Sequence, residues 1–241
     1  KVQFVKDHCG RRDVHRIEAR LANGASLVLF LKRTWRPYKK DGLSSILARG
    51  RVCSSARREW ENALTLQRAG LRVAEPVAYG EDCGLCWERF SFLLTEAAAG
   101  TRTLEQFLRA CSDPRCRRRV FDALAAEIRR LHQAGLATPD LFTRHIFVSA
   151  ETDPPRFCFI DMARLDRRVR VPLRLAARDL AALNVTAPLR HVTLRERLRF
   201  LRVYAGGADR RLRKRVVART TRLLRRRRFQ VFFRNSDPNV K

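Results

Sequence analysis

The sequence predicts an α+β fold with two lobes, a small β-rich N-lobe followed by a mostly helical C-lobe. The prediction rests on the order of the elements: a hairpin signal, one helix and two strands come first, and helical patterns fill most of the remainder. With 241 residues and 45% hydrophobic content, the chain suits one large domain or two lobes that share an interface. We expect the N-lobe over residues 1–97 and the C-lobe over residues 98–241.

The N-lobe is predicted to start with a β-hairpin. Residues 11–33 alternate and then run apolar on either side of Asn23-Gly24, a dipeptide typical of two-residue hairpin turns. A basic loop, a helix that Gly70 ends and two further strands complete the lobe, at residues 33–54, 55–69, 73–81 and 86–96. The alanine-rich stretch after Glu96 is predicted to connect the lobes.

The C-lobe is predicted to be helical with one β-rich insert. In its clearest helix, Val120, Leu124 and Ile128 repeat at helical spacing. The predicted helices begin at 103 and span 117–134, 174–183, 194–204 and 208–229. The insert holds two apolar runs, HIFV at 145–148 and FCFI at 157–160.

Charge is the most unusual feature of the composition. There are 52 Lys and Arg against 24 Asp and Glu, a formal net charge of +28. This balance indicates a polyanionic partner: nucleic acid, an anionic membrane face or a phosphorylated glycolipid. A genome rich in GC would also explain the preference for Arg over Lys, but it would not explain the low number of acids.

No membrane span, signal segment or zinc site is expected. The sequence has no run of 18 or more apolar residues and no basic-then-apolar start. Because it begins at Lys1 rather than at Met, its start says little about targeting. The seven cysteines are scattered, with a single CxxC at Cys83 and no second pair at zinc spacing, so we expect reduced thiols in a cytosolic protein.

Two acids and a histidine stand at intervals typical of phosphotransferases. Asp140 begins a loop, His145 opens an apolar run five positions later, and Asp161 follows the second run. In phosphoryl transfer one carboxylate receives the proton of the acceptor hydroxyl, a polar side chain assists the metal, and a second carboxylate holds Mg²⁺ on the ATP phosphates. Each residue alone also fits a structural role, and Mg²⁺ prefers oxygen to the imidazole of His145. His145 therefore also fits a hydrogen bond to Asp140 or to a phosphate.

A lysine and a glutamate upstream fit the remaining parts of such a site. Lys32 ends the second hairpin strand, where it can reach ATP phosphates, and Glu59 lies on the following helix, where it can hold the lysine. Glu61 competes for this role, but the two glutamates point about 200° apart on a helix. We prefer Glu59, which shares a face with Asn62.

Several segments resemble the lipopolysaccharide kinase family, the Kdo and heptose kinases of the bacterial inner core. AGL, a loop with an Asp, HIFV and FIDMARLDRR follow in that family's order, and REWENALTLQRAGLRVAEPVAYGE is similar to its Glu helix and the strand after it. ARDLAAL resembles the helix after its metal-binding loop, where Asp179 would anchor the catalytic loop. The resemblance covers roughly residues 14–201.

This resemblance implies a protein-kinase-like two-lobed fold and an ATP- and Mg²⁺-dependent sugar kinase. The acceptor would be a heptose or Kdo hydroxyl of the lipopolysaccharide core glycolipid, at the cytoplasmic face of the inner membrane. Asp140 would be the catalytic base, Lys32, Glu59 and Asp161 would bind the cofactor, and Asp161 with His145 would hold the metal.

Departures from common kinase motifs leave other functions open. TPD ends at Asp140 where many kinases have HRD, MA follows Asp161 where protein kinases have FG, and CGRR at 9–12 is a poor glycine-rich loop. The alternatives are a kinase of another small molecule or of a protein, and a basic pseudokinase that docks on anionic membrane or nucleic acid. Eleven basic residues at 210–228 favour contact with anionic lipid or glycolipid phosphate. No specific nucleic acid is expected, because no recognition motif or stacking aromatics accompany them.

Overall fold

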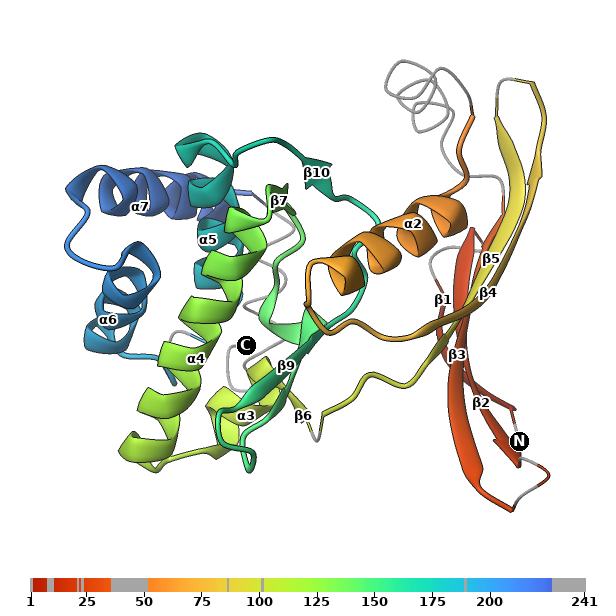
Figure 1. The fold of residues 1–241 in the computed structure, drawn as a ribbon, viewed down its shortest axis with the longest axis horizontal. Coiled ribbons are helices and arrows are strands. Elements are labelled where there is room, and N and C mark those ends of the chain that lie inside the picture. Colours follow the sequence, from red (N-terminus) through yellow and green to blue (C-terminus); the bar gives the residue numbers. More distant parts are fainter. Residues whose placement is uncertain are drawn as a thin grey trace. The chain divides into compact units, whose positions relative to one another are not determined.

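The N-terminal part of the chain is built on a five-stranded antiparallel sheet in the order β1-β2-β3-β5-β4 (Figure 1). The strands of this sheet are β1 Val2–Asp7, β2 Arg12–Arg20, β3 Ser26–Trp35, β4 Pro76–Cys83 and β5 Glu88–Glu96. The computed structural model describes residues 2–7, 11–20, 22, 24–35, 52–85, 87–100, 102–188 and 190–226. Most of the basic loop expected at 33–54, and Cys9 and Gly10 of the CGRR segment, lie outside these residues.

The predicted hairpin is confirmed as β2 and β3, and its register places basic side chains together. Val14 pairs with Lys32, and Arg12 pairs with Thr34. Because side chains two positions apart on a strand share a face, Arg12 lies on the same face as Lys32, one step along the sheet. β1 was not predicted; it adds an outer strand beside β2.

The predicted helix at 55–69 is confirmed as α2, Ser55–Arg68, and two side chains fix its start. Ser54 Oγ accepts the N–H of Arg57 at 3.0 Å. The buried carboxylate of Glu88, the first residue of β5, accepts the Ser55 N–H at 2.9 Å and the Ser55 hydroxyl at 3.0 Å. The first turn of α2 contains no acid, so Glu88 provides the negative charge that a helix N-terminus favours. This ties α2 to the sheet, along which it lies in Figure 1.

The C-terminal part is mostly helical, as predicted. Its helices are α3 Leu104–Ala110, α4 Pro114–Gln133, α5 Leu173–Thr186, α6 Leu194–Ala205 and α7 Arg210–Leu224. α6 packs on α4 and α7 on α5 (Figure 1), around fully buried side chains such as Leu124, Ile128 and Leu180. α4 begins earlier than predicted because Asp113 caps it and Pro114 suits the first turn. α7 ends at Leu224, before the predicted 229, because its last apolar residues are Leu223 and Leu224, and Arg225 and Arg226 follow them; residues 227–229 lie outside the described part.

Short strands hold the loops of this part. The runs HIFV and FCFI are confirmed as β8, Ile146–Ser149, and β9, Arg156–Phe159. They form a sheet with β6, Arg102–Thr103, and a separate pair joins β7, Leu136–Ala137, to β10, Asp166–Arg167. β6, β7 and β10 were not predicted, since a strand of two residues shows no period.

The chain divides into two compact units. The first is Lys1–Ala98 with the short segment Asp161–Arg164, and the second is Ala99–Ile160 with Leu165–Lys241. None of the helices in the described residues combines the length and the apolar character that crossing a membrane requires.

Candidate active site

In the first unit, three of the predicted site residues lie together. Lys32 Nζ lies 2.5 Å from Glu59 Oε1 and 3.9 Å from Asp161 Oδ1. Arg12, which the sequence reasoning missed, joins them: its Nη2 lies 3.6 Å from both Glu59 Oε2 and Asp161 Oδ1. Two cations and two carboxylates therefore converge from β2, β3, α2 and the segment after β9.

The structure distinguishes between the two glutamates of α2. Glu59 is buried and contacts Lys32, whereas Glu61 Oε1 accepts a hydrogen bond from Arg57 Nε at 2.9 Å. Within one helical turn, the Glu59 carboxylate therefore contacts Lys32 on β3, whereas the Glu61 carboxylate contacts Arg57 on α2 itself.

Asp161 is held in an unusual backbone conformation by α2. Its φ is +57°, in the left-handed region that Asp tolerates better than most residues. The buried amide of Asn62 donates to the carbonyl oxygens of Met162 at 2.8 Å and Ala163 at 3.2 Å. Because Asn62 lies one turn after Glu59, one face of α2 positions both Lys32 and the Asp161 segment.

In the second unit, Asp140 lies on a buried loop between β7 and the 3₁₀ turn η1, Thr143–His145. The N–H of Thr138 donates to Asp179 Oδ2 at 2.6 Å, and the Thr138 hydroxyl accepts the N–H of Asp140 at 3.2 Å. On the other side, the hydroxyl of Thr143 donates to the Thr186 carbonyl at the end of α5 at 2.9 Å. The loop is therefore fixed to α5 both before and after Asp140.

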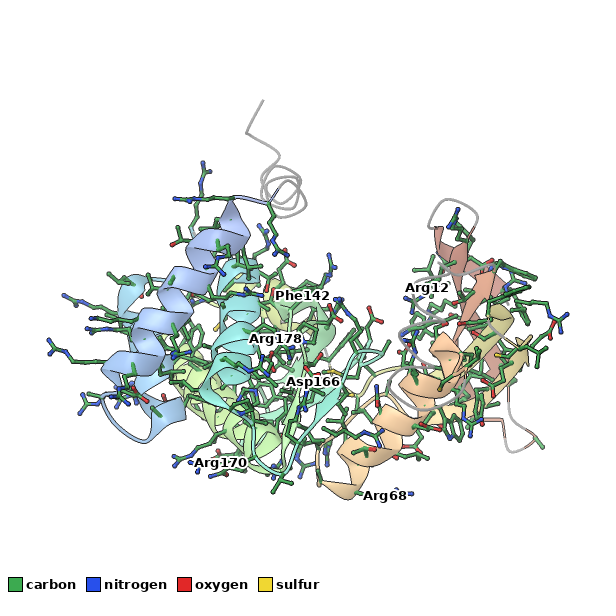
Figure 2. All side chains as sticks on the ribbon, turned by 90° about the horizontal axis from the view of Figure 1, so that it is seen from above. Arg12, Arg68, Phe142, Asp166, Arg170 and Arg178 are labelled. Carbon is green, nitrogen blue, oxygen red and sulfur yellow. The ribbon has the colours of Figure 1, made fainter. Side chains whose placement is uncertain are left out.

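Asp179 is the centre of the network that supports this loop, and its carboxylate is fully buried. Arg178 Nε donates to Asp179 Oδ1 at 2.8 Å, and Arg178 Nη1 donates to Asp166 at 2.7 Å; Figure 2 labels Arg178 and Asp166 close together. His132 Nε2 donates to Asp179 Oδ2 at 3.3 Å, and His132 Nδ1 accepts the Tyr204 hydroxyl at 2.6 Å. Burial, and then the negative charge of Asp179, raise the pKa of Tyr204 to about 12, so the hydroxyl keeps its proton.

His145 lies in the same loop as Asp140, and both of its ring nitrogens are engaged. Nδ1 donates to the carbonyl oxygen of Asp140 at 3.0 Å, and Nε2 accepts from Arg144 Nε at 3.1 Å. This fixes the neutral tautomer with its proton on Nδ1. A metal at Nε2 would require Arg144 to move away.

The donors of the first unit suit a magnesium ion that is shared with phosphate. Among the described residues, no three His, Cys, Asp or Glu side chains are grouped to hold a metal by themselves. Mg²⁺ is commonly held by one or two carboxylates together with water and substrate phosphates. The Asp161 carboxylate is 35% exposed and lies beside Lys32 and Arg12, so it can face such a shared ion.

A β-rich unit with one helix, followed by a helical unit that carries an aspartate loop, is the two-lobed α+β architecture of kinase-like proteins. The chain belongs to the lipopolysaccharide kinase (Kdo/WaaP) family, whose profile matches residues 1–204.

The relatives found for this chain are heptose kinases. It is 35% identical over 159 residues to the lipopolysaccharide core heptose(I) kinase WaaP of Pseudomonas aeruginosa, across 62% of this chain and 59% of that protein. Identity to an Escherichia coli WaaP is 28% over 173 residues, across 68% and 65%. The chain thus spans about three fifths to two thirds of the length of these relatives. A solved structure, WaaP in complex with acyl carrier protein, matches with a TM-score of 0.66 and 27% identity, over 96% of this chain and 88% of that one.

Proposed function

We propose that this chain is an ATP- and Mg²⁺-dependent kinase that phosphorylates a heptose or Kdo hydroxyl of the lipopolysaccharide inner core. The observation that carries the proposal is the Lys32–Glu59 ion pair with Asp161 beside it, in a chain whose family consists of lipopolysaccharide kinases. The named WaaP relatives favour heptose as the acceptor sugar.

Each residue of the candidate site has one task in this proposal. Lys32, oriented by Glu59, binds the α- and β-phosphates, and Arg12 adds a second cation toward the same anion. Asp161 is the oxygen ligand for Mg²⁺, which when bound offsets charge on the transferred phosphoryl group. Asp140 orients the acceptor hydroxyl and receives its proton.

Removing either acid tests the assignment. Asp140→Ala and Asp161→Ala are expected to lower kcat by about 10³-fold or more while leaving the fold intact. Asp82→Ala is the matched control, because Asp82 is exposed and its ion-pair partner within the described residues is the exposed Arg89 on the neighbouring strand. Wild-type turnover in either site variant would refute the assignment.

The acceptor is tested separately from the chemistry. Labelled ATP would be offered with lipopolysaccharide core glycans, with aminoglycosides and with protein acceptors. Transfer to the core glycan alone supports the proposal, and transfer to another acceptor would support the alternative kinase functions. Calorimetry with ATP and Mg²⁺ separates a kinase from a pseudokinase. A kinase should bind the nucleotide saturably, whereas a pseudokinase that docks on an anionic surface would show no saturable nucleotide binding.

We propose that the exposed face of α7 contacts the anionic inner face of the inner membrane. Six of its basic residues are exposed and form no ion pair with any carboxylate of the described residues. These are Arg210, Arg211, Arg213, Lys214, Arg215 and Arg222. Each basic residue near an anionic surface contributes about 1 kcal/mol. The double variant Arg211→Glu/Arg215→Glu should lose cosedimentation with phosphatidylglycerol vesicles, whereas Arg68→Glu, a reversal on exposed α2 surface, should not.

An acyl carrier protein is a second partner to test. The solved relative is a complex with that protein, and the second unit here carries a basic cleft of about 520 Å³ at the junction of α3, α4 and α6. Arg109, Arg118 and Arg190 are among its lining residues. Affinity capture with purified acyl carrier protein should be lost in Arg118→Glu; equal capture by this variant would remove the cleft from the proposal.

A further inference from the structure

Four arginines gather where α5 meets the end of α7, and we call them the α5–α7 arginine cluster. Arg178 comes from α5, Arg219 and Arg222 lie one turn apart on α7, and Arg226 follows its end. The pKa of Arg219 lies below its usual value because the side chain is desolvated and because Arg226, Arg222 and Arg178 carry like charge nearby. The four guanidinium groups therefore act on one another.

Two nitrogens of this cluster are buried without a hydrogen-bond partner. They are Arg178 Nη2 and Arg219 Nε, two of the three side-chain atoms of this kind in the described residues. The other two nitrogens of the Arg178 guanidinium group have acceptors, because Nε donates to Asp179 and Nη1 donates to Asp166. Buried guanidinium N–H groups almost always have an acceptor, so these two are candidates to bind one.

The charge of the cluster points to the kind of acceptor. Its neighbouring carboxylates, Asp166 and Asp179, are both engaged by Arg178, and Asp179 also accepts from Thr138. Four positive groups beside two carboxylates leave an excess of positive charge, which an anion would offset. A phosphomonoester carries about two negative charges and three acceptor oxygens, and guanidinium forks match its geometry.

We propose that the α5–α7 arginine cluster is a binding site for a phosphomonoester group, separate from the Lys32 and Asp140 sites. Arg219 and Arg178 contribute their unpartnered N–H groups, and the exposed Arg222 adds a further positive charge beside Arg219. The proposal does not depend on the kinase assignment. It gives the chain a second phosphate site, one of whose residues, Arg178, also bonds Asp179.

Direct binding tests this site without a kinase assay. Calorimetry with inorganic phosphate and with a soluble sugar phosphate, without ATP or Mg²⁺, would use a Lys32→Met background to remove binding at the candidate active site. Saturable binding is expected, and Arg219→Gln should weaken it roughly tenfold or more, as loss of a charged hydrogen bond implies. Arg222→Gln should also weaken it; because Arg222 is exposed, this variant tests the site even if Arg219→Gln does not fold. Arg68→Gln, exposed on α2 and outside both the cluster and the α7 face, should bind within about twofold of the wild type.

Vesicles then identify the source of the phosphate. Stronger binding to phosphatidic acid than to phosphatidylglycerol, lost in Arg219→Gln, assigns a lipid phosphomonoester as the ligand. Binding of the soluble phosphates without a preference between these lipids assigns a soluble ligand. Absence of saturable phosphate binding, or equal weakening by Arg68→Gln, overturns the proposal, and neither result bears on Lys32, Asp140 or the kinase reaction.

Discussion

Replacing Asp179 by Asn would test whether a single buried charge holds the Asp140 loop. The substitution keeps the shape of the side chain but exchanges one carboxylate oxygen for an NH₂ group. Oδ1 accepts from Arg178, and Oδ2 accepts from Thr138 at 2.6 Å and from His132 at 3.3 Å. Whichever oxygen is replaced, a donor then faces a donor in a fully buried position. With hydrogen bonds to a charged group at about 1.5–3 kcal/mol each, the free energy of unfolding should fall by about 2–4 kcal/mol.

Urea unfolding measures this loss, and steady-state kinetics measures its effect on the loop. Because Thr138 would lose its anchor two residues before Asp140, kcat should fall roughly 10²-fold with a smaller change in KM. Asp166→Asn is the matched control: Asp166 bonds the same arginine but is 34% exposed, so we expect less than about 1 kcal/mol. A variant of Asp179 with the wild-type urea midpoint and the wild-type kcat would refute the reasoning.

Three further perturbations follow from contacts in the two units. Glu59→Gln should lower kcat/KM roughly 10²-fold by removing the charge that orients the β3 lysine, whereas Glu61→Gln should be close to the wild type; equal effects would contradict the assignment. The hydrogen bond from Arg33 holds the pKa of Asp13 below its usual value, so Asp13 contributes stability above pH 3.8 that is lost as pH falls through its lower folded pKa. The difference in thermal midpoint between the wild type and Asp13→Asn should therefore shrink in strong acid, and a constant difference down to pH 2 would refute this. Gly135→Ala should cost about 2 kcal/mol or more in chemical denaturation, because φ is +77° and the added Cβ would lie 2.0 Å from a carbonyl oxygen; an unchanged midpoint would show that the turn adapts.

The elements with a strong local signal were predictable from the sequence. The Asn-Gly turn located the β2–β3 hairpin, the apolar stripe of α4 located the longest helix, and the two apolar runs located β8 and β9. Helix geometry indicated that Glu59 and Glu61 cannot share a role, the face shared with Asn62 favoured Glu59, and Glu59 is the glutamate that contacts Lys32. These inferences succeed because each depends on neighbours within about one helical turn or one strand pair.

Contacts that depend on register or on tertiary packing were not predictable. The place of Arg12 beside Asp161 follows from the β2–β3 register, and many other arginines of this chain show the same local sequence character. Asn62 looks like any polar helix residue until the segment after Asp161 is seen to turn back onto α2. The left-handed backbone of Asp161 also has no signal in the sequence, since a glycine would normally mark it.

The clamp between Glu88 and the start of α2 determines where the first unit can accept added chain. Because β5 pairs with β3 and β4 and also fixes α2, deleting one residue inside β5 would reverse the faces of its side chains and separate Glu88 from Ser55. The described residues of the β4–β5 turn show no such constraint: Leu85 is 99% exposed, and a main-chain hydrogen bond from the Gly84 N–H to the Trp87 carbonyl closes the turn. A peptide tag or a fluorescent reporter inserted after Gly84 should therefore leave the unit folded, which makes this turn a suitable attachment point for following the protein in solution or on vesicles.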